Sequence, residues 1–104
     1  MKLNSKQRSF LKQQAHSLTA VVRIGKDGLT DNIIENIENA IRVKELIKVK
    51  ALQNAELSKQ ELREIAEEIA KKAEVEIVDI IGKTIIFFKE NEKKPVYSDK
   101  IKKI

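Results

Sequence analysis

The clearest ligand chemistry in this 104-residue chain comes from a loop at residues 25–30, here called the glycine loop. Gly25 and Gly28 stand three positions apart, which lets the main chain take positive φ and approach another molecule closely. Thr30 is a suitable N-cap for a following helix, with Leu29 placed to pack against Ile34. The unpaired N–H groups of a helix start attract anions, so this junction predicts a phosphate site. A tight strand-to-helix turn without a ligand explains the same residues.

Basic side chains elsewhere are candidates to extend this site. Arg8, Lys12 and His16 recur every fourth residue and therefore share one ridge of a helix, which either contacts phosphates or is simply solvated. Two lysines of a predicted strand belong either to a solvated surface or to a binding platform. The candidate residues are Gly25, Lys26, Asp27, Gly28, Leu29 and Thr30 of the glycine loop, with Arg23, Arg8, Lys12, His16, Lys48, Lys50 and Lys83.

The carboxylates of the chain raise the alternative of a small enzyme. Asp27, Asp31 and Glu35 lie close in sequence, and paired carboxylates act as acid and base or hold a metal ion. Acidic residues in the first turn of a helix more commonly stabilise the helix dipole. With one histidine and no cysteine, a histidine-based metal site or a Ser-His-Asp triad has little to build on. We therefore expect a protein that is not an enzyme and needs no metal or cofactor.

The positive charge is concentrated at the two ends of the chain. Residues 1–30 carry six Lys or Arg against one acidic residue, and residues 91–104 carry five lysines against two acidic residues. Residues 31–90 carry ten basic and thirteen acidic residues. This distribution predicts one side that faces a polyanion and another that faces solvent. The third predicted helix is assigned to the solvent side by its acidic residues, Glu61, Glu64, Glu67 and Glu68.

Hydrophobic periodicity and helix caps predict the element order αβαβαββ. Helices are expected near residues 4–15, 31–43 and 58–73, and strands at 20–24, 46–52, 75–81 and 84–89. Strands separated by helices favour parallel neighbours, whereas the Gly82–Lys83 turn favours an antiparallel hairpin. We expect an α/β domain over residues 1–90, with a four-stranded mixed sheet and helices mostly on one face. The strand order stays open, and residues 91–104 are expected to be a basic, mobile tail.

Length and composition limit the class of protein. A chain of 104 residues with 41% hydrophobic content is long enough for a single core. No apolar run reaches the roughly 18–20 residues of a membrane span, and the start shows no signal-peptide hydrophobic region. The absence of cysteine excludes disulfides. We expect a cytoplasmic monomer with no membrane contact.

Five short motifs occur in the order and at the spacing of one known family. They are Ser5-Lys6-Gln7, Ala15-His16, Ile24-Gly25-x-x-Gly28-Leu29-Thr30, Glu45-Leu-Ile-Lys-Val-Lys50 and Ile81-Gly-Lys-Thr84. Over about residues 3–89 the chain resembles a CRM domain, and among CRM proteins it is similar to the single-domain bacterial YhbY type. Each motif alone is weak, whereas the five together are specific.

The resemblance implies an RNA-binding domain whose fold is similar to the C-terminal domain of translation initiation factor three. It also implies that the glycine loop is the GxxG loop that contacts RNA, as in KH domains. For single-domain bacterial members it implies association with precursor large ribosomal subunits and a role in ribosome assembly. The alternative is a protein-interaction module on the ribosome that uses the acidic third helix.

Overall fold

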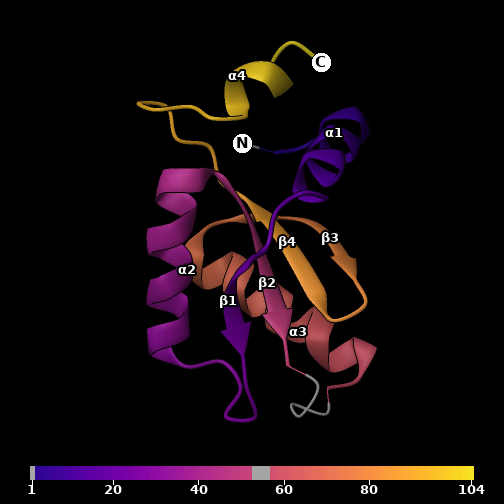
Figure 1. Cartoon of the computed structure of the whole chain (residues 1–104), viewed down its shortest axis with the longest axis vertical. Helices are drawn as coiled ribbons and strands as arrows, with labels where there is room; N and C mark the ends of the chain where they lie inside the picture. Colours follow the sequence, from indigo (N-terminus) through magenta and orange to yellow (C-terminus); the bar gives the residue numbers. More distant parts are fainter. Residues whose placement is uncertain (1, 53–56) are drawn as a thin grey trace.

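The computed structural model describes residues 2–52 and 57–104. Its helices are α1 (Ser5–Ala15), α2 (Asp31–Lys44), α3 (Lys59–Ala73) and α4 (Ser98–Ile101), and its strands are β1 (Ala20–Ile24), β2 (Leu46–Ala51), β3 (Glu76–Ile81) and β4 (Thr84–Phe88). The predicted order αβαβαββ is confirmed over these ranges, with α4 added after it (Figure 1). Residues 1 and 53–56 of the predicted domain lie outside the described residues. Among the described residues, no helix combines the length and apolar content that crossing a bilayer requires.

The sheet of the described chain has four strands in the order β1-β2-β4-β3. β1 is parallel to β2, whereas β4 is antiparallel to both of its neighbours, so the sheet is mixed as predicted. The parallel pair follows from α2, which carries the chain back along the sheet between β1 and β2. A turn at Gly82, whose φ is +58°, joins β3 directly to β4. The hairpin therefore places β4 beside β2 and β3 at the edge of the sheet. The sequence alone did not determine this strand order.

Side-chain caps determine where the helices begin. Asn4 accepts a hydrogen bond from the Gln7 N–H at 2.8 Å, and the Gln7 side chain accepts one from the Asn4 N–H. Ser58 and Glu61 form the same reciprocal box at the start of α3. Thr30 caps α2 through its side-chain oxygen. Because each cap satisfies N–H groups that the first turn leaves unpaired, the predicted helix starts are confirmed.

Alternating side chains divide the core between the two faces of the sheet. On β2, Ile47 belongs to the cluster under α2 and α3, and Leu46 belongs to the cluster under α1. Phe87 and Phe88 of β4 divide in the same way, and both are fully buried. Helices α2 and α3 thus cover one face, and α1 lies with α4 at the upper end of the other (Figure 1). The part of that face that α1 leaves open is where an interface can form.

The C-terminal segment packs against the core, whereas the sequence predicts a mobile tail. Ser98 and Ile101 are fully buried, and the Ile101 carbonyl accepts a hydrogen bond from the Gln7 side chain at 2.9 Å. The prediction rested on many lysines and little periodicity. A helix of four residues is too short to produce a periodic signal, so the sequence pattern could not reveal it.

Glu45, at the junction of α2 and β2, holds this segment in place. Its carboxylate is fully buried, and Oε1 accepts hydrogen bonds from the N–H groups of Val96 and Tyr97 at 2.6 Å and of Ser98 at 3.0 Å. Oε2 accepts from the Asn91 N–H at 2.6 Å and from the Ser98 hydroxyl at 2.8 Å. Burial alone raises the pKa of Glu45, but hydrogen bonds to the ionised form outweigh it and hold the pKa below its usual value.

Candidate nucleic-acid interface

The glycine loop leads from the carboxyl end of β1 to the start of α2, at the lower end of the molecule in Figure 1. The Gly28 N–H donates to the Gly25 carbonyl at 3.1 Å, and Gly28 has a φ of +73°. A Cβ added at Gly28 would meet nothing within 4 Å, whereas one at Gly25 would touch the Leu52 side chain at 4.0 Å. Gly28 is therefore needed for its backbone conformation, and the space around it is open to an approaching molecule.

The start of α2 supplies N–H groups beside this loop. The Thr30 side chain accepts one of them as the cap, and Leu29 packs partly buried against the core. Lys26 and Asp27 are both exposed at the tip of the loop, and Asp31 stands in the first turn of the helix. Because the side chains carry both signs of charge, the main-chain N–H groups are the part of this junction best suited to a phosphate.

The predicted ridge on α1 is partly used to attach that helix to β3. The Arg8 guanidinium donates to the Val78 carbonyl at 3.1 Å and also to the Ile77 carbonyl. Lys12 pairs with Asp79 at 3.0 Å, although half of the Lys12 side chain is exposed. Arg8 thus has a structural role that helical spacing alone did not predict, while Lys12 remains accessible from solvent.

Basic side chains of β1 and β2 lie together on the part of the sheet beside α1. The register pairs Arg23 with Lys50. Lys48 lies on the same face two residues earlier, and its ammonium donates to the Leu18 carbonyl at 3.0 Å. Within the described residues, the side chains of Arg23, Lys26 and Lys50 make no hydrogen bond or ion pair. No other residue in the described part of the chain therefore neutralises their charge.

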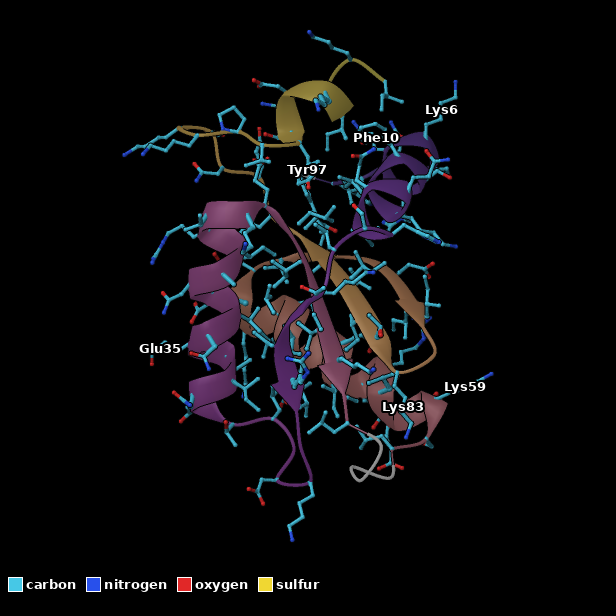
Figure 2. All side chains as sticks on the ribbon, in the orientation of Figure 1. Lys6, Phe10, Glu35, Lys59, Lys83 and Tyr97 are labelled. Carbon is cyan, nitrogen blue, oxygen red and sulfur yellow. The ribbon has the colours of Figure 1, made fainter. Side chains whose placement is uncertain are left out.

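A hollow of about 180 Å³ lies where α1 meets this face. It is lined by Lys12, His16, Lys48, Ile81, Thr84 and Ile86. The fold thus brings together predicted residues from α1 and β2 that are far apart in the sequence. Lys83, labelled in Figure 2, stands at the turn between β3 and β4, and its carbonyl accepts from the Ala51 N–H at 2.8 Å. This bond attaches the turn to the end of β2.

The start of α3 lies beside the same turn, which the sequence did not predict. Lys59, Leu62 and Arg63 of α3 line a hollow of about 280 Å³ together with Ile80 and Gly82. The acidic residues of α3 had assigned the whole helix to the solvent side. The hollow that they share with Gly82 places the first turns of α3 beside the hairpin turn that carries Lys83, a neighbourhood that no local sequence pattern reveals.

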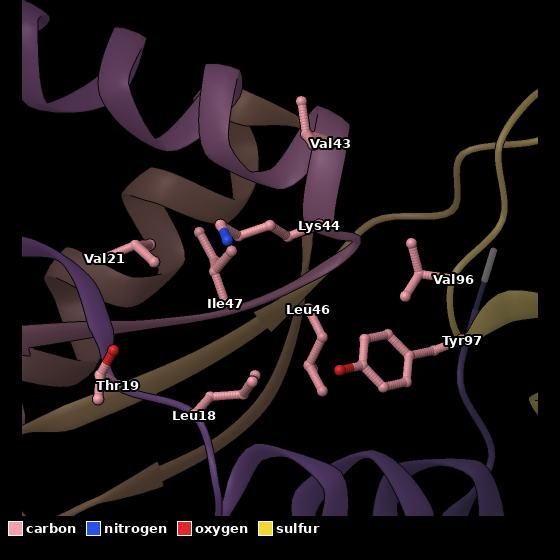
Figure 3. Close-up of a pocket in the computed structure, with 9 residues that line it drawn as sticks. All are labelled: Leu18, Thr19, Val21, Val43, Lys44, Leu46, Ile47, Val96 and Tyr97. Atoms are coloured by element: carbon pink, nitrogen blue, oxygen red, sulfur yellow. The ribbon is translucent and has the colours of Figure 1, made fainter.

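A further hollow, of about 320 Å³, lies at the opposite end of β1 (Figure 3). Its lining is mostly apolar and includes Leu18, Val21, Val43, Leu46, Ile47, Val96 and Tyr97, with Thr19 and Lys44. Lys44 is the one charged residue in that lining among those described. Tyr97 is the other ionisable side chain among the described residues of this lining, which include no carboxylate and no histidine.

The carboxylates that suggested an enzyme are dispersed on the surface. Asp27, Asp31 and Glu35 are all exposed. In the part of the chain that the structure describes, no three His, Asp or Glu side chains gather closely enough to hold a metal ion. Asp31 lies in the first turn of α2, where a carboxylate interacts favourably with the helix dipole.

Comparison with known families identifies the fold as a whole. The model of the CRS1 / YhbY (CRM) domain matches residues 3–89. The chain belongs to the CRM-domain family. The match runs from the residue before the α1 cap to the end of β4, and so contains the glycine loop and the basic face of this CRM domain.

Two curated relatives of this CRM-domain chain cover most of its length. A Bacillus subtilis protein named "Probable RNA-binding protein YqeI" is 41% identical over 90 residues, which are 86% of this chain and 91% of that protein. A Haemophilus influenzae protein named "RNA-binding protein" is 37% identical over 90 residues, 86% of this chain and 88% of that protein.

A solved structure shares the fold. The solution structure of the hypothetical protein SAV1595 from Staphylococcus aureus matches with a TM-score of 0.76 at 33% identity. The match covers 88% of this chain and 92% of that chain. The predicted mixed α/β fold is therefore confirmed for this chain, and a solved structure of similar sequence shares it.

Proposed function

We propose that this CRM-domain chain is a non-catalytic RNA-binding protein that acts as a cytoplasmic monomer and assists assembly of the large ribosomal subunit. The observation that carries the proposal is the open glycine loop beside a sheet face on which Arg23 and Lys50 form no hydrogen bond or ion pair with any other described residue. The names of the relatives from Bacillus subtilis and Haemophilus influenzae support RNA as the ligand. Precursor ribosomal RNA as the target rests on the resemblance to single-domain bacterial CRM proteins.

In this proposal the loop positions the RNA and the cations attract it. Main-chain N–H groups near Gly28 and Thr30 bind phosphate oxygens, while Arg23, Lys26 and Lys50 displace counterions from the RNA backbone. Phe87 and Phe88 are fully buried and are not available to stack on bases. Recognition therefore depends on the RNA backbone and its shape more than on base stacking.

The ribosomal part of the proposal predicts how the protein sediments. Tagged protein in a cell extract should move through a gradient with precursors of the large ribosomal subunit, because it is bound to their RNA. Ribonuclease treatment before the run should return it to the top of the gradient. Protein that stays at the top without ribonuclease, or that sediments equally after the treatment, would contradict RNA-dependent association with the subunit.

The basic face predicts the effect of a double substitution. Arg23→Gln with Lys50→Gln should weaken binding to precursor large-subunit RNA roughly ten-fold, because two unpaired cations are lost. The slope of log affinity against log salt should fall by about 1.4–1.8. Binding titrations at several salt concentrations measure both quantities. Arg8 is unsuitable for this test because it anchors α1 to β3.

The matched control makes the same charge change far from the loop. Lys93→Gln with Lys94→Gln alters the C-terminal segment, at the other end of the molecule (Figure 1). Both side chains are exposed, so thermal unfolding should be unchanged. Equal loss of affinity in the two double variants would mean that net charge alone drives binding, and the proposed face would be wrong.

A further inference from the structure

Main-chain hydrogen bonds join the glycine loop to the turn between β3 and β4. The Leu52 N–H donates to the Ile24 carbonyl at 2.9 Å, just before the loop begins. One residue earlier on β2, the Ala51 N–H donates to the Lys83 carbonyl at 2.8 Å. The ends of β1 and β2 and the hairpin turn therefore form one continuous edge. Figure 1 shows these strand ends and the turn in the lower half of the molecule, and Figure 2 labels Lys83 and Lys59 there.

Lys59 and Arg63 of α3 lie beside the hairpin turn, where they line a hollow together with Ile80 and Gly82. Lys59 and Arg63 are four residues apart and so lie on one side of the helix. Both are exposed, and within the described residues neither side chain makes a hydrogen bond or ion pair. Glu67, one turn after Arg63, forms no ion pair with it. No ion pair with another described residue therefore neutralises Lys59 or Arg63.

The hollow between these cations and the turn has a surface suited to one nucleotide. Its volume is about 280 Å³, and its lining combines Lys59 and Arg63 with Leu62, Ile80 and Gly82. Leu62 is buried and Ile80 partly buried, so they provide an apolar wall for a sugar or base. The two cations provide contacts for a phosphate. Gly82 has no side chain that would close the hollow.

We infer that RNA bound at the glycine loop continues around the hairpin turn, and that Lys59 and Arg63 contact a nucleotide seated in this hollow. The inference rests on the proposed function and adds a second contact region to it. The molecule measures 23 Å along each of its two shorter axes, so a strand that crosses this end needs only a few nucleotides. Glu67 and Glu68, further along α3, repel the RNA backbone from the second half of the helix, whereas Glu61 and Glu64 lie beside the two cations and lower the net positive charge there.

The test compares the two ends of the same helix. Lys59→Gln with Arg63→Gln should weaken binding to a transcribed precursor of large-subunit ribosomal RNA roughly ten-fold. The salt slope should fall by about 1.4–1.8, as expected for two lost phosphate contacts. The control is Lys71→Gln with Lys72→Gln in the last turn of α3, which makes the same charge change. The control should bind like wild type, and thermal unfolding should show that both variants fold.

The outcomes separate this inference from the proposed function. If wild type binds the RNA and the Arg23 and Lys50 double variant is weakened, normal binding by the Lys59 and Arg63 double variant overturns this inference alone. Equal weakening by the control at the other end of α3 overturns it as well, because the effect would then follow net charge. A wild-type protein that does not bind the RNA overturns the inference and the proposed function together.

Discussion

A Gly28→Asp variant should fold and yet lose at least ten-fold in affinity for RNA. Gly28 has a φ of +73°, so any side chain there adds backbone strain of about 1 kcal/mol or somewhat more. A domain with about 5–15 kcal/mol of stability tolerates that cost, and no atom within 4 Å obstructs a Cβ. The new carboxylate would stand at the start of α2, where the proposal places a phosphate. Binding therefore suffers more than stability.

Gly28→Asn separates the charge from the strain. Asn has the shape of Asp and also tolerates positive φ, so it should lower the melting temperature by a similar amount. Because Asn is neutral, most of the affinity should remain. Lys26→Ala should cost less than Gly28→Asp, since it removes one exposed charge and keeps the main-chain N–H groups. Thermal unfolding and RNA titration are measured on each variant, and a folded Gly28→Asp protein with wild-type affinity would exclude the loop as the RNA site.

Glu45→Gln should lower the stability of the fold by about 2–5 kcal/mol. The buried carboxylate accepts five hydrogen bonds from residues 91–98, and all five donors face its two oxygens. An amide has one acceptor oxygen, and its NH2 group would face donors in place of the second oxygen. For a domain of this size the loss corresponds to roughly 10 °C or more in melting temperature.

The matched control is Glu74→Gln, at the end of α3. Glu74 also has positive φ, +56° against +63° for Glu45, so both substitutions place Gln at a φ that L side chains rarely adopt, although ψ differs between the two sites. Glu74 is exposed, and no hydrogen bond to its carboxylate is present among the described residues. Its substitution should change the melting temperature little. Equal effects at the two positions would mean that the carboxylate contacts of Glu45 do not stabilise the fold.

Acid should reduce the difference between wild type and Glu45→Gln. The pKa of Glu45 in the folded protein lies below its ordinary value of 4.5, so its stabilising contribution is complete above that value. The contribution is lost as the pH falls through the folded-state pKa, whereas the variant has no carboxylate to protonate. Melting temperatures measured from about pH 7 to about pH 3 should therefore converge. A difference that stays constant would contradict an ionised Glu45.

Local signals in the sequence were enough to predict most of the elements. Residue type and spacing mark Thr30 as a cap, and hydrophobic periodicity places the helices and strands close to where the structure has them. The strand order depends on pairing between β2 and β4, which are far apart in the chain, so no local pattern encodes it. The short α4 is held by the buried Glu45 carboxylate, by the Gln7 side chain and by the burial of Ile101, and these long-range contacts are also invisible to periodicity.

The candidate site shows the same division between local and long-range information. The glycine loop and the cap at Thr30 lie within one short stretch, so the sequence predicted their geometry directly. The use of Arg8 depends on main-chain carbonyls of β3, and the neighbours of Lys59 depend on the position of the hairpin turn. Contacts of this kind depend on how distant parts of the chain meet in the fold. The sequence therefore shows that these residues are positively charged, but not which of them are held by the protein and which are accessible to RNA.

The contacts of Glu45 show that the cooperatively folding part of the chain extends further than the part that is similar in sequence to the family. The family match ends at residue 89, whereas the donors that satisfy the carboxylate belong to residues 91–98 and the buried Ile101 follows them. A fragment cut at residue 89 would keep every family motif and leave an ionised side chain without its donors. The unit that unfolds cooperatively therefore includes Ile101, a dozen residues beyond the end of the similarity.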